Sequence, residues 1–162
     1  MTGFYRKVVG DMSAEFVDFM LFLVANLYNL LMVSIFLSRT RNLQKIEHDF
    51  GLAAVCLAIP LVAVLLYNSV TGRDLWLVGL PLPLIIFLGL EWCLDYLLKL
   101  DFRSTRWLGP YLLVYYLGLF GMIGYTFLVG KLYGFVTLAT YFLNLFTSFY
   151  SYSRVRHGSS SR

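Results

Sequence analysis

Two carboxylates, Glu91 and Asp95, lie inside the long apolar stretch LWLVGLPLPLIIFLGLEWCLDYLL. If this stretch crosses a membrane, an ionised carboxylate at the depth of Glu91 is costly unless it is paired or protonated. Acids at such depths are functional candidates by default, and Glu91 could bind a proton, a cation or an amine group. A structural role for Glu91 is an equally open alternative. For Asp95, the simpler interpretation is an ion pair near the helix end with Lys99, four residues later, or with a loop arginine.

Other apolar stretches carry polar residues at a similar depth. We counted residues inward from the span ends on the side of the membrane that holds the C-terminus. Four residues lie about seven or eight positions from these ends, which is a depth of roughly 10–12 Å at the rise per residue of an α-helix. These are Asn29, Glu91, Tyr115 and Asn144. We expect them to form one polar layer just inside the midplane, in which the two asparagines and the tyrosine would orient a ligand held by Glu91.

The composition requires a membrane setting for these residues. Of 162 residues, 59% are hydrophobic and 14% are charged, against about 25% charged in a soluble domain. The apolar runs are continuous rather than alternating, which excludes strands and predicts helices. We therefore expect an all-α, polytopic integral membrane helix bundle that forms one transmembrane domain over residues 1–156. Its five predicted spans cover approximately residues 16–37, 51–68, 76–98, 107–130 and 132–152.

The two chain ends carry separate expectations. The small polar ending 157–162 is interpreted as a disordered tail or the remnant of a purification tag. The N-terminal segment FYRKVVGDM is expected to form an interfacial helix. No cleavable signal peptide is recognised, because the first apolar run is too long and no small-residue cleavage site follows it.

Basic residues are distributed unequally between the two sides of the predicted bundle. Nine fall on the side of the C-terminus and four on the other side. The positive-inside rule therefore predicts a cytoplasmic C-terminus and an outside N-terminus in a plasma or inner membrane. Contacts with anionic lipid headgroups, or ion pairs, are expected for five loop residues on the cytoplasmic side. These are Arg39, Arg41, Lys99, Arg103 and Arg106.

Helical periodicity gives each span one polar or small face, and these faces should meet inside the bundle. The faces consist of Glu15, Asp18, Asn26 and Asn29; of Cys56, Pro60, Ala63 and Tyr67; of Glu91, Asp95 and Lys99; of Tyr111, Tyr115, Gly118, Met122 and Tyr125; and of Thr137, Thr140, Tyr141, Asn144, Thr147, Ser148 and Ser151.

Prolines and glycines predict where the spans bend and where they approach closely. Pro60 should kink the second span, and Pro81 with Pro83 should break the third, freeing backbone carbonyls that need other partners. The glycines of the GLFGMIG stretch recur every third residue, which favours close helix packing.

Three functions are compatible with this pattern. The first is binding or transport of a small molecule, cation or lipid at the polar layer around Glu91. Five spans are few for a complete transporter, so a homo-oligomer or a partner membrane subunit is expected. The second is a non-catalytic subunit, scaffold or assembly protein whose polar faces dock partner helices. A lipid-modifying enzyme is third, because no nucleophile–base pair, metal-ligand set or phosphate-binding loop occurs. No cofactor, metal or nucleic acid partner is expected.

Overall fold

The computed structural model describes residues 2–98 and 107–159, and side chains for 13–98 and 107–154. The described residues form helices and no strands. In chain order the helices are α1 (Thr2–Thr40), α2 (Gln44–Cys56), α3 (Ala58–Val70), α4 (Leu75–Gly79), α5 (Leu82–Glu91), the π-helix η1 (Trp92–Leu97), α6 (Leu108–Val129) and α7 (Lys131–Ser159).

These helices make five segments that are long and apolar enough to cross a membrane. They run over Ser13–Thr40, Gln44–Val70, Leu75–Leu97, Leu108–Val129 and Lys131–Arg154. Their outward sides are large apolar groups, as at Ile59, which is 74% exposed, and Phe146, which is 68% exposed. So much exposed apolar surface is unfavourable in water and favourable in contact with lipid. The all-α bundle and its five spans are therefore confirmed, and the chain is an integral membrane protein.

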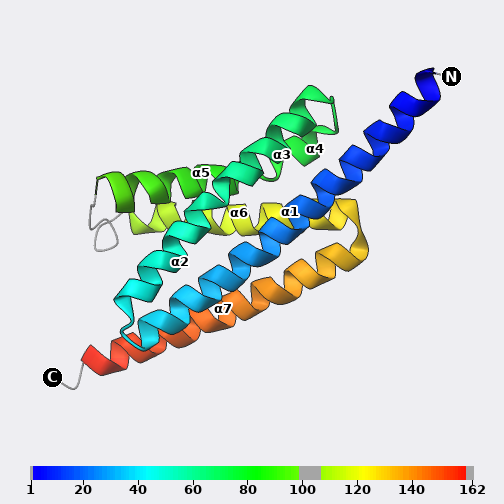
Figure 1. Cartoon of the computed structure of the whole chain (residues 1–162). Helices are drawn as coiled ribbons and strands as arrows, with labels where there is room; N and C mark the ends of the chain where they lie inside the picture. The colour runs from blue at the N-terminus through cyan, green and yellow to red at the C-terminus, as the bar shows by residue number, and fades with distance from the viewer. Residues whose placement is uncertain (1, 99–106, 160–162) are drawn as a thin grey trace.

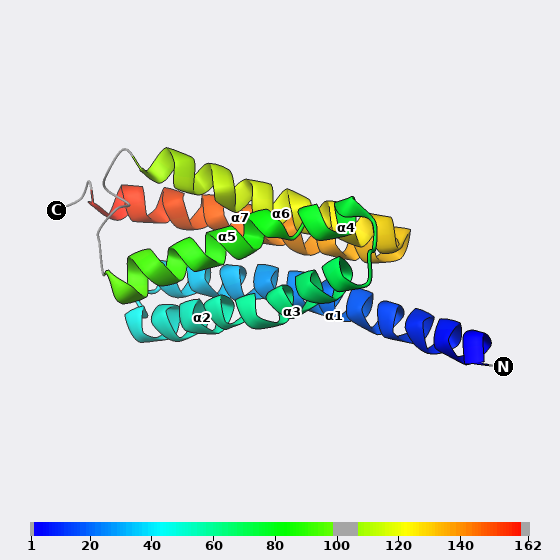
Figure 2. The same cartoon turned by 90° about the horizontal axis from the view of Figure 1, so that it is seen from above.

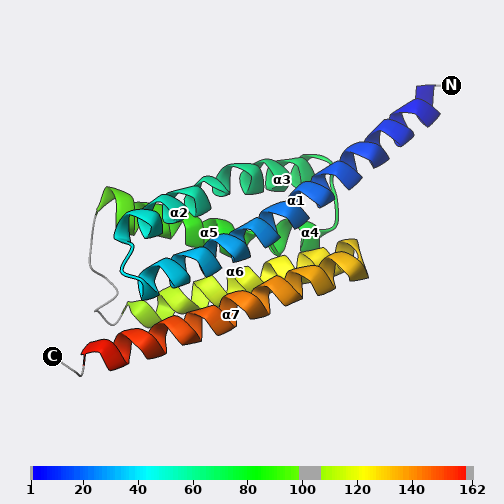
Figure 3. The same cartoon turned by 60° about the horizontal axis from the view of Figure 1, so that its bottom comes forward.

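The five spans are arranged as a closed ring (Figures 1 and 2). Helix α1 packs between α7 and α2, α7 packs on α6, α6 packs on α5, and α3 closes the ring against α5. Figure 3 shows α1 and α7 side by side over most of their length, with the N-terminal part of α1 extending beyond the bundle. The C-terminus and the α1–α2 turn lie at the same end, which we call the C-terminal end.

The core of the ring is one apolar cluster with members from every span. Its buried side chains include Leu21 of α1, Leu61 of α3, Leu84 of α5, Met122 of α6 and Tyr141 of α7. Because the core and the lipid-facing surface are both apolar, burial in this bundle depends on shape and polar contacts more than on hydrophobicity.

The prolines interrupt the spans as predicted. The second span breaks at Leu57, between α2 and α3, because Pro60 has no N–H to offer the Cys56 carbonyl. The third breaks between α4 and α5, around Pro81. Pro81 likewise leaves the Leu77 carbonyl without its helical donor, and that oxygen instead accepts a hydrogen bond from Asn68 Nδ2 at 3.0 Å.

The α6 glycines are packing residues, as predicted. A Cβ on Gly118 would lie 2.9 Å from the Leu84 Cα, and one on Gly121 would collide with the carbonyl oxygen of Leu80. Both neighbours lie at the α4–α5 break, so the glycines of α6 accommodate the backbone of the interrupted span.

The inner face predicted for the second span is wrong. Cys56 and Ala63 are exposed, whereas Leu61, Val64 and Asn68 are buried. This span carries few polar groups to mark its inner side, and apolar side chains are equally acceptable to core and lipid. The inner faces predicted for α6 and α7 are buried or half-buried throughout.

Helix extends beyond the predicted spans at both chain ends. The segment expected to form an interfacial helix is helical and continuous with α1, which begins at Thr2. At the other end α7 continues to Ser159, two residues past the start of the predicted tail at 157. The last three residues, 160–162, lie outside the described part of the chain.

Candidate functional site

A cavity of about 540 Å³ lies at the C-terminal end of the bundle. Its walls come from the second half of α1, from α2, from α5 with η1 and from the start of α6, with Tyr152 added from α7. The volume falls within the range of roughly 300–1,000 Å³ that is typical of small-molecule sites. All these elements belong to spans, so the cavity extends into the apolar part of the bundle.

The deep part of the cavity is apolar and aromatic. Ala54, Phe87 and Leu88 are buried there. The Phe87 ring lies between two tyrosine rings, with centroids 5.0 Å from Tyr111 and 5.1 Å from Tyr115. The three rings form a continuous aromatic wall on the α5–α6 side.

Glu91 lies on this aromatic wall. It is half-buried and lines the cavity, and its Oε2 accepts a hydrogen bond from the Tyr111 hydroxyl. Asp95 also lines the cavity, but it belongs to the π-helix η1. Glu91 and Asp95, predicted to share one face, both line the cavity, and Lys99, the third residue of that predicted face, lies outside the described segments.

One buried polar group in the cavity lacks a partner. Tyr28 of α1 is 1% exposed and lines the cavity. Its hydroxyl makes no hydrogen bond within the described chain. Buried hydroxyls are normally satisfied, and an exception at a cavity wall indicates a place where water or a ligand group binds.

The outer rim of the cavity is charged and more exposed. Arg39 at the end of α1 forms an ion pair with Glu47 of α2, with Nη2 2.5 Å and Nε 3.0 Å from Oε1. An ion pair is one of the two roles predicted for Arg39, the other being contact with a lipid headgroup. Beside it, the His48 and Tyr96 rings lie 5.3 Å apart between centroids. Arg41 is exposed in the α1–α2 turn. Three other basic residues of the prediction lie outside the described segments: Lys99, Arg103 and Arg106.

Three of the four residues predicted for the polar layer are hydrogen-bonded to one another behind the cavity. Asn144 Nδ2 lies 3.2 Å from Asn29 Oδ1 and 3.1 Å from the Tyr115 hydroxyl. Asn29 in turn donates to Thr140 Oγ1 at 3.1 Å. Tyr115 and Glu91, the fourth predicted member, line the cavity, whereas the two asparagines do not. The bonded residues thus join α1, α6 and α7, and they hold the Tyr115 ring against the cavity.

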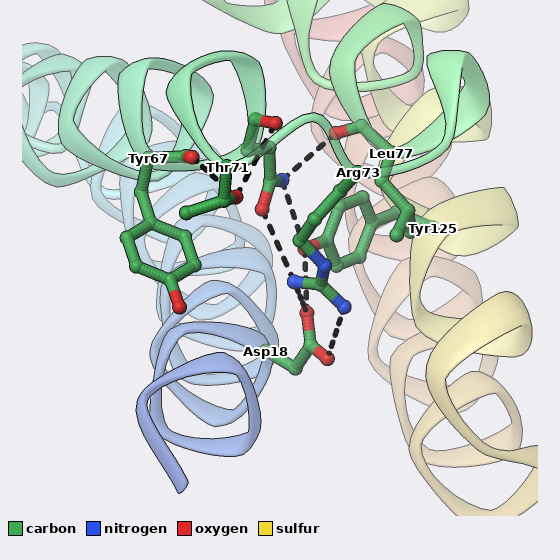
Figure 4. A network of polar contacts seen from close by, with 7 residues as sticks. Asp18, Tyr67, Thr71, Arg73, Leu77 and Tyr125 are labelled. Carbon is green, nitrogen blue, oxygen red and sulfur yellow. Dashed lines mark hydrogen bonds and ion pairs between the residues drawn. The ribbon is translucent and has the colours of Figure 1, made fainter. Parts of the chain in front are cut away.

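A second polar network, at the opposite end of the bundle, was not predicted (Figure 4). Arg73, in the α3–α4 loop, forms a two-pronged ion pair with Asp18 of α1, with N–O distances of 2.7 and 2.8 Å. Tyr125 donates to Asp18 at 2.7 Å, and Arg73 also donates to Asn68 at 3.1 Å. The hydrogen bond with Asp18 raises the pKa of the Arg73 guanidinium, which therefore stays protonated.

The sequence contained a signal for this network. Asp18 lies on the predicted polar face of α1, and Arg73 is the basic residue of the second connection. The position of Asp18 indicates an inward-facing charge that needs a partner, and Arg73 is a basic residue that could supply it. The spacing alone did not show that the loop folds back over the bundle end.

The fold and the site together define a polytopic membrane helix bundle with a cavity at its C-terminal end. Within the described residues, no group of three or more His, Cys, Asp or Glu side chains could hold a metal ion. Comparison with protein families, curated proteins and solved structures finds no match for this chain.

Proposed function

We propose that this protein binds an amphiphilic small molecule or lipid inside the membrane, in the cavity beside Glu91. The observation that carries the proposal is the buried Tyr28 hydroxyl, which has no partner in the described chain and belongs to a residue that lines the same cavity as Glu91. A polar ligand group placed between them would satisfy the hydroxyl and contact the acid.

The cavity suits a ligand with one apolar and one polar end. Its deep wall contains Phe87 and Leu88, which can contact hydrocarbon, and its rim contains the Arg39–Glu47 pair. In this proposal Glu91 and Asp95 bind the polar end, and Tyr115 shapes the wall. Asn29 and Asn144 position Tyr115 through the polar layer rather than contacting the ligand.

The predicted orientation places the mouth of the cavity at the cytoplasmic face. There the basic residues Arg39, Arg41, Lys99, Arg103 and Arg106 would lie near anionic headgroups. A ligand could then enter from the cytoplasmic leaflet, and the protein could bind it alone or transport it together with a partner or a second copy.

The alternative of a non-catalytic scaffold receives less support. That alternative relied on polar faces and glycine seams that dock partner helices. In the structure the polar face of α7 bonds to α1 and α6, and the α6 glycines pack on α4 and α5. Contacts within the chain account for these polar and glycine faces, so the faces do not require a partner protein.

Native mass spectrometry of the protein released in mild detergent and mixed with host lipid extract tests the proposal. Ala54 is buried at the cavity wall and its neighbour Ala53 faces outward, so Ala54→Phe and Ala53→Phe form a matched pair. We expect the wild type and Ala53→Phe to retain one small molecule that Ala54→Phe loses, because a phenyl ring at position 54 occupies ligand space.

Equal retention, or no retention, in all three proteins would contradict the proposed site. Val55 and Cys56 give a second pair, which serves if Ala54→Phe does not fold. Val55 lines the cavity and Cys56 is exposed, so only Val55→Phe should reduce binding.

A further inference from the structure

We infer that the polar group of the ligand is a neutral oxygen, the hydroxyl, carbonyl or ether oxygen of a largely apolar molecule, and that Tyr28 is the residue that selects it. This inference rests on the proposed function, because it requires that the cavity binds a ligand. It adds the charge of the polar group of the ligand, and it names the side chain that binds this group.

The charged side chains of the cavity wall already have partners within the chain. Arg39 pairs with Glu47 at the rim. Glu91 accepts the hydrogen bond of the Tyr111 hydroxyl, and Asp95 also interacts with another part of the chain. A charged ligand group would have to compete with these partners. The charged lining therefore does not call for a counter-ion.

The Tyr28 hydroxyl differs from these groups. Its side chain is buried and lines the cavity, and the hydroxyl makes no hydrogen bond within the described chain. A tyrosine hydroxyl can both donate and accept a hydrogen bond. A buried hydroxyl without a partner costs free energy, and a ligand oxygen bonded to it would recover that cost. What the described wall lacks is thus a neutral hydrogen-bonding partner.

The depth of Tyr28 also favours a neutral group. The α1 residues that line the cavity run inward from Arg39 at the rim to Tyr28, eleven positions earlier, which is about 16 Å along the helix axis. This is about half the thickness of a hydrocarbon core of roughly 30 Å. The buried Phe87 and Leu88 belong to the same lining. An ion is costly in such surroundings, whereas a neutral oxygen loses little once it is hydrogen-bonded.

Probes that share one chain and differ at its end test the inference. Dodecanol and dodecyl methyl ether carry a neutral oxygen, dodecane carries none, and dodecyltrimethylammonium carries a charge. Binding is measured by calorimetric titration in a neutral detergent, and the signal obtained with Ala54→Phe is subtracted because it reports partition into the micelle. We expect the two oxygen probes to bind the wild type at least about fivefold more tightly than dodecane, the worth of one hydrogen bond. The cation should bind no more tightly than dodecane.

Tyr28→Phe removes the hydroxyl and keeps the ring, so it should abolish the preference for oxygen and leave dodecane binding unchanged. The unliganded variant should be at least as stable as the wild type in thermal unfolding, because the lost hydroxyl had no partner in the described chain. Tyr125→Phe is the matched control, since this buried tyrosine lies at the opposite end and its hydroxyl bonds to Asp18. It should be less stable and keep the preference.

The possible contrary results have different meanings. Equal binding of dodecane and dodecanol, tightest binding of the cation, or a preference for oxygen that survives in Tyr28→Phe would overturn the inference while a cavity ligand remained supported. The first two comparisons use the wild type alone, so they hold even if the variant does not fold. No binding of any probe beyond the Ala54→Phe background, with no adduct in native mass spectrometry, would overturn the proposed function itself.

Discussion

Asp18 and Arg73 illustrate how a membrane helix bundle holds buried charge. Their side chains are 13% and 20% exposed, and each ion is bonded to a further polar group as well as to its partner. Taking two ions out of water costs several kcal/mol each, and good geometry with extra hydrogen bonds is what offsets that cost. The network also fixes the α3–α4 loop to α1, since Arg73 belongs to the loop and Asp18 to the helix.

Asp18→Asn should therefore destabilise the protein by about 1–3 kcal/mol, because it leaves the guanidinium of Arg73 without its carboxylate. The measurement is the free energy of unfolding from denaturant titration in detergent micelles. Glu15→Gln, on an exposed position one turn earlier, is the matched control and should lie within about 0.5 kcal/mol of the wild type.

The double variant Asp18→Asn with Arg73→Gln separates a pairwise interaction from general damage. It should be less destabilised than the sum of the two single variants, because removing both charges leaves no unpaired ion. Strictly additive effects, or an Asp18→Asn protein as stable as the wild type, would show that the ion pair contributes nothing.

At the scale of elements, the interrupted third span explains the composition of its neighbours. The break around Pro81 leaves the Leu77 carbonyl without its helical donor, and the Leu80 carbonyl lies against α6. Asn68 of α3 donates to the first, and Gly121 of α6 leaves room for the second. An asparagine and a glycine on two different spans are thus consequences of one proline on a third.

Gly121→Ala should destabilise the protein by about 1–3 kcal/mol, because its Cβ would collide with the backbone oxygen of Leu80 and force α6 away from the break. Gly89→Ala is the control, since a Cβ at that position on α5 would meet nothing within 4 Å. It should be neutral, or stabilising by up to about 1 kcal/mol through helix propensity. Equal effects of the two substitutions in thermal unfolding would contradict close packing at the break.

At the scale of the whole molecule, the ring of five spans leaves two dissimilar ends. One end holds the Asp18–Arg73 network and the other holds the cavity with its charged rim. The odd number of spans requires that the two termini lie on opposite sides of the membrane. The charge asymmetry of the loops predicts which side each occupies.

Protease protection on intact cells tests that orientation. We expect an epitope tag at the N-terminus to be cleaved from outside and one at the C-terminus to be protected until the cells are lysed, because nine of the thirteen basic residues lie on the C-terminal side. Cleavage of the C-terminal tag from outside would reverse the predicted orientation and place the mouth of the cavity on the outer face.

The sequence by itself determined the class, the five spans and the proline breaks. It also placed Asn29, Tyr115 and Asn144 at one depth, although the fourth member of the predicted layer, Glu91, lies on the cavity wall beside Tyr111. These follow from local quantities: apolar length against membrane thickness, the missing proline N–H, and helical periodicity of polar groups. Helical periodicity predicted the inner face of α7 correctly, because polar groups mark one side of that helix. It predicted the wrong inner face for the second span, where Cys56 and Ala63 face outward.

Only the tertiary structure decided which polar groups meet and where space remains. The Asp18–Arg73 pair joins residues 55 positions apart through a loop that folds back over the bundle end. The cavity depends on how helices from all five spans are placed around it, with Glu91 at the end of α5 and Asp95 in the π-helix both on its wall. In a bilayer both sides of a helix can be apolar, so hydrophobicity cannot select the neighbours. Small residues, breaks and buried hydrogen bonds select them, and these act only once the chain has packed.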